Sequence, residues 1–117
     1  MGSKFTEDPE RMRLVLEDLK RRGLFFLDSR TTPNTVGFRL SQELGLKTGQ
    51  RNVFLDNERD VSKIKIKIFE LIQLSHRNGG AIGIAHPHAE TIQALRETLP
   101  SLRENGVKLV PVSSLLE

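Results

Sequence analysis

The sequence predicts an α/β fold in which helices alternate with the strands of a parallel sheet. Segments with apolar residues at helical spacing alternate with short apolar runs that are typical of buried strands. A glycine follows each predicted helix, and the unit of helix, glycine and strand recurs four times along the chain. Such alternation favours parallel strands joined by right-handed crossovers.

Length and composition fit one domain and narrow the range of partners. A chain of 117 residues can bury a modest core, so we expect a single domain over residues 1–117. The 18 Lys and Arg residues slightly outnumber the 15 Asp and Glu residues and are spread along the predicted helices. Because Trp and Tyr are also absent, we expect no nucleic-acid partner. No run is apolar enough for a membrane span, and the lack of cysteine excludes thiolate metal ligands.

The first half of the chain predicts two helices and two strands. Asp8 is a capping residue, Pro9 suits the first helical position, and Gly23 ends the helix. In the second helix, apolar residues recur every four positions. The predicted elements are a helix over residues 9–22, a strand over 24–27, a helix over 33–45 and a strand over 52–55.

The second half contains one ambiguous segment, residues 64–68, where Ile alternates with Lys as in a strand. A helical stripe of apolar residues continues through this segment from Val61, and Asp60 can cap its start, so we predict a helix. Pro100 is expected to kink or split a later helix. The predicted elements are a helix over residues 60–78, a strand over 81–85, a helix over 90–105, a strand over 107–110 and a last helical turn over 112–117.

The strand predicted over residues 81–85 is followed by the best single candidate for a functional residue. The run is apolar and uncharged, which indicates a strand buried on both faces. Pro87 has no amide hydrogen to donate, so the strand must end near His86. In α/β folds, functional side chains gather at the carboxyl ends of parallel strands.

Three predicted strands end in polar side chains that suit a common site. Asp28, Asp56 and His86 follow successive strands at intervals of 28 and 30 residues. Strands in register bring their carboxyl ends to one edge of a sheet, so we expect these three side chains at one rim. Arg30, Asp56 and His88 are the candidates for contacts with a substrate.

Each of these residues also has a structural interpretation that remains open. The imidazole of His86 can donate a proton near neutral pH, or it can end a strand by binding a backbone carbonyl. Asp28 either orients His86 or caps the turn that follows its own strand. His88 is either exposed or a helix cap, Asp56 is equally suited to a turn, and Arg30 can pair with Asp28 instead of a substrate.

Four motifs resemble the divergent polysaccharide deacetylase family, which belongs to the NodB-like superfamily of distorted (β/α) barrels. The motifs are Gly2-Ser3 with Thr6-Glu7-Asp8, Phe26-Leu27-Asp28-Ser29-Arg30-Thr31, Val53-Phe54-Leu55-Asp56-Asn57, and Ile84-Ala85-His86-Pro87-His88 with Thr91-Ile92. The resemblance covers almost all of this chain but only about the later half of the family domain. It implies that residues 1–117 are the C-terminal portion of a larger barrel.

The resemblance also implies an activity, namely removal of N- or O-acetyl groups from a carbohydrate with the help of a divalent metal, expected to be zinc. It implies that His86 is the general acid and that Asp28 orients it, which makes these two the expected catalytic residues. The metal ligands are unknown, because the family's early Asp and His motifs have no counterpart in these residues. The family implies a periplasmic or other extracytoplasmic location.

A non-catalytic α/β module that binds a glycan or a protein partner is the alternative interpretation. Such a module retains the residues at the rim of the barrel but lacks the family's early metal ligands. A metal titration distinguishes the two interpretations, because a binding module need not take up metal. In either case, strands at the open edges of a partial barrel can pair with another chain. We therefore expect a homo-oligomer, or completion of the sheet by an N-terminal half.

Overall fold

Both strand pairs are parallel, as the alternation of helices and strands predicts. β1 (Phe26–Asp28) pairs with β2 (Thr48–Gln50), and β3 (Val53–Phe54) pairs with β4 (Gly83–Ile84). The computed structural model describes residues 2–117, and within them each sheet has two strands and no barrel closes. The α/β class is confirmed, whereas membership of a barrel stays a prediction.

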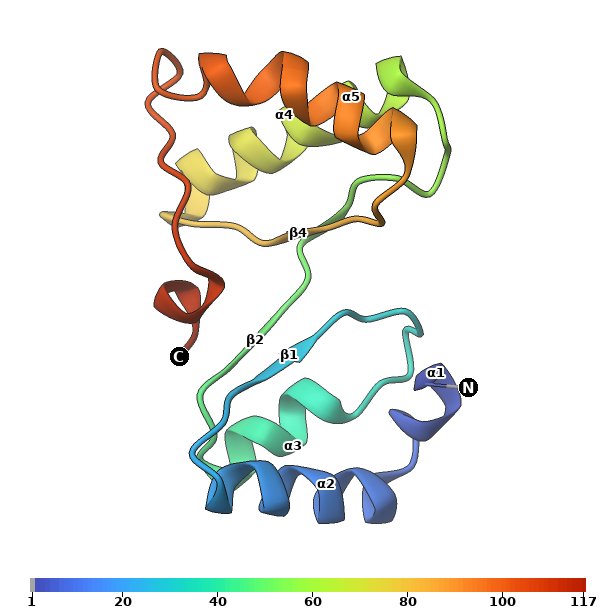
Figure 1. The fold of residues 1–117 in the computed structure, drawn as a ribbon. Helices are drawn as coiled ribbons and strands as arrows, with labels where there is room; N and C mark the ends of the chain where they lie inside the picture. Colours follow the sequence, from blue (N-terminus) through green and yellow to red (C-terminus); the bar gives the residue numbers. More distant parts are fainter. Residues whose placement is uncertain (1) are drawn as a thin grey trace. The chain divides into compact units, whose positions relative to one another are not determined.

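The chain forms two units of structure. One unit contains the residues up to Gln50 together with Leu116 and Glu117, and the other contains Arg51–Leu115. Figure 1 shows the helices and strands of each unit. The expectation of a single domain over residues 1–117 stays a prediction. None of the helices in the described part of the chain is long and apolar enough to cross a membrane.

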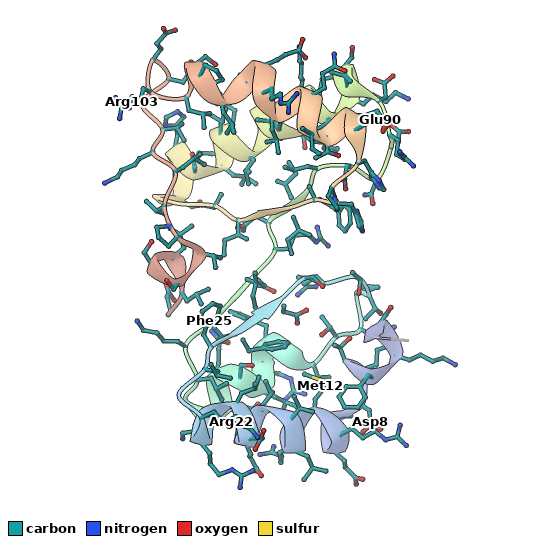
Figure 2. All side chains as sticks on the ribbon, in the orientation of Figure 1. Asp8, Met12, Arg22, Phe25, Glu90 and Arg103 are labelled. Atoms are coloured by element: carbon teal, nitrogen blue, oxygen red, sulfur yellow. The ribbon has the colours of Figure 1, made fainter. Side chains whose placement is uncertain are left out.

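The first unit packs two helices against each other, as their apolar stripes predict. The Asp8 side chain caps α2 by accepting hydrogen bonds from the backbone N–H groups of Glu10 and Arg11. Met12 points from α2 toward α3 (Figure 2). The helices are α1 (Gly2–Phe5), α2 (Pro9–Arg21) and α3 (Gly37–Leu44), and the buried core residues are Met12, Leu16, Leu40 and Leu46.

β1 begins two residues later, and ends one residue later, than the strand predicted over residues 24–27. Gly23 has a φ of 70°, and the N–H of Leu24 donates to the Leu19 carbonyl to close the end of α2. Ladder hydrogen bonding therefore begins only at Phe26. The backbone N–H of Leu24 is used at the end of α2 and not in the strand pairing, and Leu24 is 51% exposed.

α3 is shorter than predicted, and β2 was not predicted. Residues 32–36 form a turn before the helix, in which the N–H of Thr35 donates to the Thr32 carbonyl at 3.4 Å. The predicted end is confirmed, since Gly45 has a φ of 78° and closes the helix. β2 has the sequence Thr-Gly-Gln, which carries no apolar pattern from which a strand could be predicted.

The second unit contains the longest helix, which resolves the ambiguous segment in favour of the helical interpretation. In α4, Ile64 and Ile68 are buried while Ile66 is 58% exposed, which is helical and not alternating burial. Asp60 caps the start, as predicted, by accepting a hydrogen bond from the Lys63 N–H. The helices are α4 (Val61–Asn78), α5 (Ala89–Thr98) and two 3₁₀ turns, η1 (Leu99–Ser101) and η2 (Val112–Leu115).

α5 ends at Thr98 and Pro100 lies in η1, so the helix predicted over residues 90–105 is interrupted at Pro100, as predicted, but does not continue beyond it as an α-helix. The strand predictions on either side of α5 are only partly correct. β4 covers two of the residues predicted as strand over 81–85, and both are half-buried instead of fully buried. The segment 107–110, predicted as a fourth strand, pairs with no strand in the described chain, and Leu109 is 68% exposed. Because no strand forms at residues 107–110, β4 pairs only with β3 among the described residues and is less buried than predicted.

Candidate functional site

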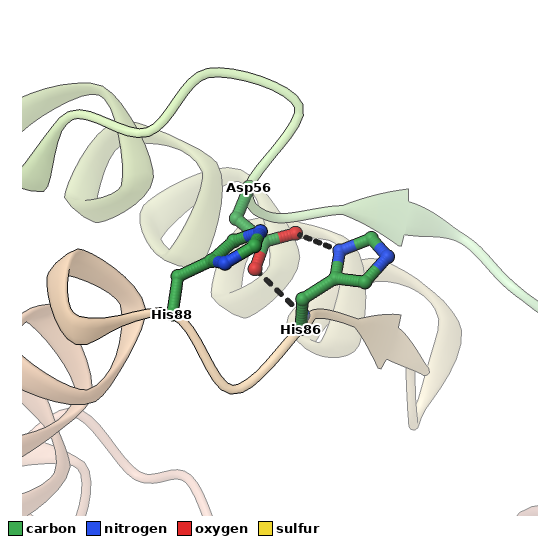
Figure 3. A group of neighbouring side chains, drawn as sticks. All are labelled: Asp56, His86 and His88. Carbon is green, nitrogen blue, oxygen red and sulfur yellow. Dashed lines mark hydrogen bonds and ion pairs between the residues drawn. The ribbon is translucent and has the colours of Figure 1, made fainter.

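Asp56 and His86 meet where two neighbouring parallel strands end. Asp56 comes two residues after β3, and His86 comes two residues after β4. Because β3 and β4 run in parallel with Phe54 opposite Ile84, their carboxyl ends lie side by side. The Nδ1 atom of His86 lies 3.0 Å from Oδ1 of Asp56, as Figure 3 shows. The predicted proximity of these two residues is confirmed.

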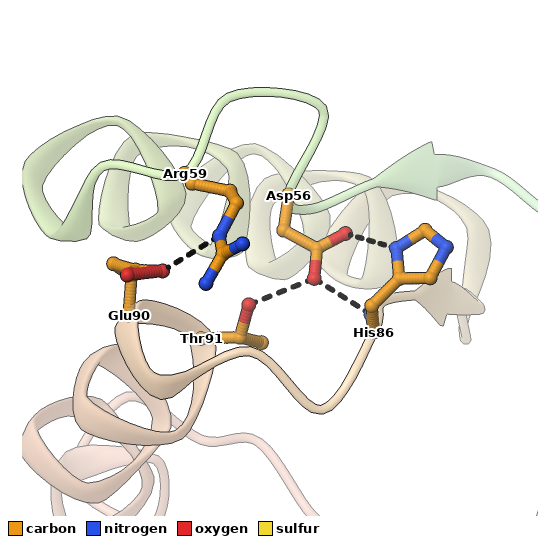
Figure 4. Close-up of polar contacts among 5 residues, drawn as sticks. All are labelled: Asp56, Arg59, His86, Glu90 and Thr91. Carbon is orange, nitrogen blue, oxygen red and sulfur yellow. Dashed lines mark hydrogen bonds and ion pairs between the residues drawn. The ribbon is translucent and has the colours of Figure 1, made fainter.

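The Asp56 carboxylate is buried and fully hydrogen-bonded. Its side chain has no exposed surface, and its Oδ1 atom contacts the His86 ring. Its Oδ2 atom accepts hydrogen bonds from the backbone N–H of His86 at 2.6 Å and from the Thr91 hydroxyl at 2.7 Å (Figure 4). A buried carboxylate needs such donors to compensate for the loss of water.

These contacts determine the charge of Asp56. Burial raises the pKa of the carboxyl group, but the hydrogen bonds from the His86 backbone, the Thr91 hydroxyl and the His86 ring lower it. The resulting pKa lies below the ordinary value of 3.8. Asp56 is therefore ionised at neutral pH.

The hydrogen bond to Asp56 also assigns the two ring nitrogens of His86. An ionised carboxylate can only accept, so Nδ1 is the donor, and Nε2 is left for another partner. The His86 side chain is 55% exposed, and its ring lies 5.5 Å from the Phe54 ring and 5.2 Å from the His88 ring, measured between centroids. His86 is thus anchored at one nitrogen and accessible to solvent.

His88 completes a group that could hold a metal ion. It occupies the N-cap position of α5, but its side chain makes no capping hydrogen bond. One nitrogen or oxygen atom from each of Asp56, His86 and His88 lies within 4.8 Å of the others. Carboxylate and imidazole are suitable ligands for zinc and other divalent metals. The donor set therefore fits a divalent metal, although it does not identify one.

An ion pair lies beside this group and joins the same two chain segments. Nε of Arg59, in the loop after β3, donates to Oε2 of Glu90 in the first turn of α5 at 3.0 Å (Figure 4). The hydrogen bond from Arg59 lowers the pKa of Glu90. The loop that carries Asp56 is thus tied to α5 both by Thr91 and by Glu90.

Asp28 and Arg30 belong to the first unit. Oδ1 of Asp28 accepts from the Arg30 backbone N–H, and Oδ2 accepts from the Thr35 hydroxyl and the Phe38 N–H. The capping interpretation of Asp28 is confirmed. Its expected place at a rim with His86, and its expected role in orienting that residue, stay predictions. Nη1 of Arg30 donates to Gln50 at 2.7 Å.

Sequence reasoning did not identify three residues of the site. Nothing in the sequence marks Thr91 as a contact of Asp56, yet its hydroxyl binds that residue and Thr91 is 1% exposed. Arg59 and Glu90 are separated by thirty-one residues, and nothing in the sequence links them. The one available signal for Thr91 was its place in the motif that follows His86.

The fold and the site define an α/β protein with a buried aspartate and a histidine at the ends of neighbouring parallel strands. Residues 1–116 match the family described as divergent polysaccharide deacetylase. The chain belongs to this family, which confirms the resemblance that the four motifs indicate.

Relatives in two bacteria match almost the whole chain. The protein is 40% identical over 116 residues to YibQ of Escherichia coli (strain K12), described as uncharacterized, and the match covers 99% of this chain and 36% of YibQ. It is 34% identical over 115 residues to an uncharacterized protein of Haemophilus influenzae, covering 98% of this chain and 41% of that protein. The chain thus spans about two-fifths of the length of these relatives.

A solved structure has the same fold over nearly all of the chain. The crystal structure of the uncharacterized protein ATU2773 from Agrobacterium tumefaciens C58 aligns with a TM-score of 0.92 at 29% identity. The alignment covers 95% of this chain and 45% of that protein.

Proposed function

We propose that this chain contributes part of the active site of a metal-assisted deacetylase that acts on an acetylated carbohydrate. The observation that carries the proposal is the contact between buried Asp56 and exposed His86 at adjacent strand ends, in a member of the divergent polysaccharide deacetylase family. The activity, the substrate and the roles of the residues below are proposals.

In this proposal water attacks the acetyl carbonyl carbon, the bond from that carbon to the sugar nitrogen or oxygen breaks, and His86 donates a proton to the departing sugar atom. Asp56 holds Nδ1 and stabilises the charged imidazolium, so that Nε2 carries the proton to be transferred. The exposure of the His86 ring gives a substrate access to Nε2. Among the described residues, the carboxylate that contacts this ring is Asp56, and we therefore assign it the orienting role.

A divalent metal fits the same group of residues. If His86 were a ligand and not the proton donor, Asp56, His86 and His88 would hold it, and a bound ion would polarise the acetyl carbonyl as a Lewis acid. Nε2 of His86 cannot hold a metal and carry a proton at the same time. The hydrogen bonds favour the proton, because both oxygens of Asp56 already bind protein donors and its carboxylate is closed to solvent.

Acetate release from N-acetylated and O-acetylated oligosaccharides tests the proposal, measured for the chain alone and for the chain within a complete family domain. We expect release that falls by about 10²–10⁴-fold in His86→Ala, the usual contribution of a general acid. His76→Ala is the matched control, since His76 lies in the last turn of α4, outside the group around Asp56. Full activity in His86→Ala would remove His86 from the mechanism.

Zinc titration by calorimetry decides between the two uses of His86. Zinc uptake that survives His86→Ala supports the proton donor, and uptake lost in both His86→Ala and His88→Ala would overturn it in favour of a ligand. Saturable binding of an oligosaccharide without zinc uptake or acetate release would overturn the hydrolase and support the binding module.

A further inference from the structure

The Thr91 hydroxyl is a buried group of the site to which the proposed chemistry gives no role. Thr91 lies in the first turn of α5, it is 1% exposed, and its Oγ1 atom donates to Oδ2 of Asp56 at 2.7 Å. Oδ2 of Asp56 also accepts a hydrogen bond from the backbone N–H of His86 at 2.6 Å. One carboxylate oxygen therefore joins the end of β3, the residue that carries the imidazole and the start of α5.

This use of the hydroxyl differs from the ordinary use of threonine in a helix. Thr98, near the other end of α5, donates its hydroxyl to the carbonyl of Ala94, four residues earlier in the same helix. Thr91 instead donates out of its helix to a residue thirty-five positions away. A local role in capping α5 does not account for that contact, because the hydroxyl binds none of the helix's own backbone groups.

The two donors on Oδ2 fix the plane of the Asp56 carboxylate. With Oδ2 held from two directions, Oδ1 faces Nδ1 of His86 at 3.0 Å. A carboxylate held by a single donor can rotate, and hydrogen bonding to a rotating acceptor is weaker because it depends on direction. A residue can orient a functional histidine through the group to which that histidine is hydrogen-bonded. Substitution of such a residue commonly changes the behaviour of a site, although the residue touches no ligand.

We infer that Thr91 is a positioning residue, whose hydroxyl orients Asp56 so that His86 carries its proton on Nδ1 and presents Nε2. The inference rests on the proposed function, because that function is the reason why the orientation of His86 matters. The tautomer that the inference predicts can be measured without metal or substrate. It predicts that a hydroxyl at position 91, and not the shape of threonine, sets the balance between the two neutral forms of His86.

Long-range ¹H–¹⁵N NMR of the ¹⁵N-labelled, metal-free chain at a pH where His86 is neutral reports the proton on each ring nitrogen. In the unaltered chain we expect the Nδ1–H form to predominate for His86. Thr91→Val keeps the shape and removes the hydroxyl, and we expect the ratio of Nδ1–H to Nε2–H to fall about tenfold, as befits the loss of one buried hydrogen bond. Thr91→Ser restores the hydroxyl and should restore the ratio.

Thr98→Val is the matched control, since it removes a hydroxyl from the same helix but none from Asp56. It should leave the His86 ratio unchanged. If Thr91→Val does not fold, Thr91→Ala removes the same hydroxyl without a branched side chain. An unchanged ratio in the folded variant, or the same shift in Thr98→Val, would overturn the inference. Either result is independent of acetate release, so failure of the proposed function would be seen separately.

Discussion

The Asp56 carboxylate accepts three hydrogen bonds while it is closed to solvent. Its pKa is lower in the folded chain than its ordinary value of 3.8, so folding favours its ionised form. The stabilisation is complete above the ordinary pKa and is lost as the pH falls through the lower pKa of the folded state. We therefore predict that the free energy of unfolding falls with acidification from about pH 4 downward.

Urea unfolding of the chain and of Asp56→Asn at a series of pH values, with a chelator present, checks this prediction. The difference in stability between the two should shrink as the pH falls below about 4, because the wild-type carboxyl group then gains a proton. Equal pH dependence in both proteins would contradict it. Should Asp56→Asn fail to fold, NMR titration of the Asp56 carboxyl carbon provides the pKa directly.

At the residue scale, the sequence predicts the location of the site better than the contacts within it. Asp56 and His86 follow apolar runs, and the rule that functional groups gather at strand ends is enough to single them out. The pairing of β3 with β4, which decides which carboxylate meets His86, depends on tertiary contacts that no local pattern reveals. The resemblance implies that Asp28 orients His86, whereas the carboxylate that contacts the His86 ring in the structure is Asp56.

Gly37, at the start of α3, provides a prediction at the scale of an element. A Cβ atom there would lie 2.7 Å from the Phe26 ring and 3.1 Å from Oδ2 of Asp28. Alanine normally favours a helix over glycine by about 0.5–1 kcal/mol, but overpacking costs about 1–3 kcal/mol. We predict that Gly37→Ala destabilises the chain by about 1–2 kcal/mol, measured by urea unfolding.

Gly2→Ala is the control for that variant, because a Cβ atom at Gly2 meets no atom within 4 Å. It should be neutral or slightly stabilising. Stabilisation by Gly37→Ala would show that the Phe26 ring moves aside freely and that the packing of α3 on β1 is loose.

At the element scale, helices are predicted more accurately than strands. The caps at Asp8 and Asp60 and the end at Gly45 are local signals, and each helix that they mark is present. A strand needs a partner, and the sequence does not show one. Three of the four residues over 107–110 are apolar, yet they form no strand, since no neighbouring strand in the described residues pairs with them.

At the scale of the whole chain, the last two residues belong to the first unit. The backbone N–H and carbonyl of Thr48 bond to the carbonyl and N–H of Glu117, both at 3.0 Å, and Leu116 is 8% exposed. We predict that deletion of Leu116 and Glu117 speeds hydrogen exchange at Thr48 by about tenfold, since these bonds protect β2. Ser114→Ala, which alters an exposed side chain, should leave that exchange unchanged.

The strand pairs predict how the chain behaves in solution. Two-stranded sheets are marginal alone, and open strand edges pair with other chains. Some apolar residues are also exposed, and the exposed fractions are 51% for Leu24, 42% for Phe25 and 68% for Leu109. Exposed apolar surface of this kind favours association between chains. We predict that sedimentation velocity shows a coefficient that rises with concentration, and that Leu109→Lys reduces the rise. A monomer at every concentration with sharp thermal unfolding would mean that these edges and side chains are covered within a single chain.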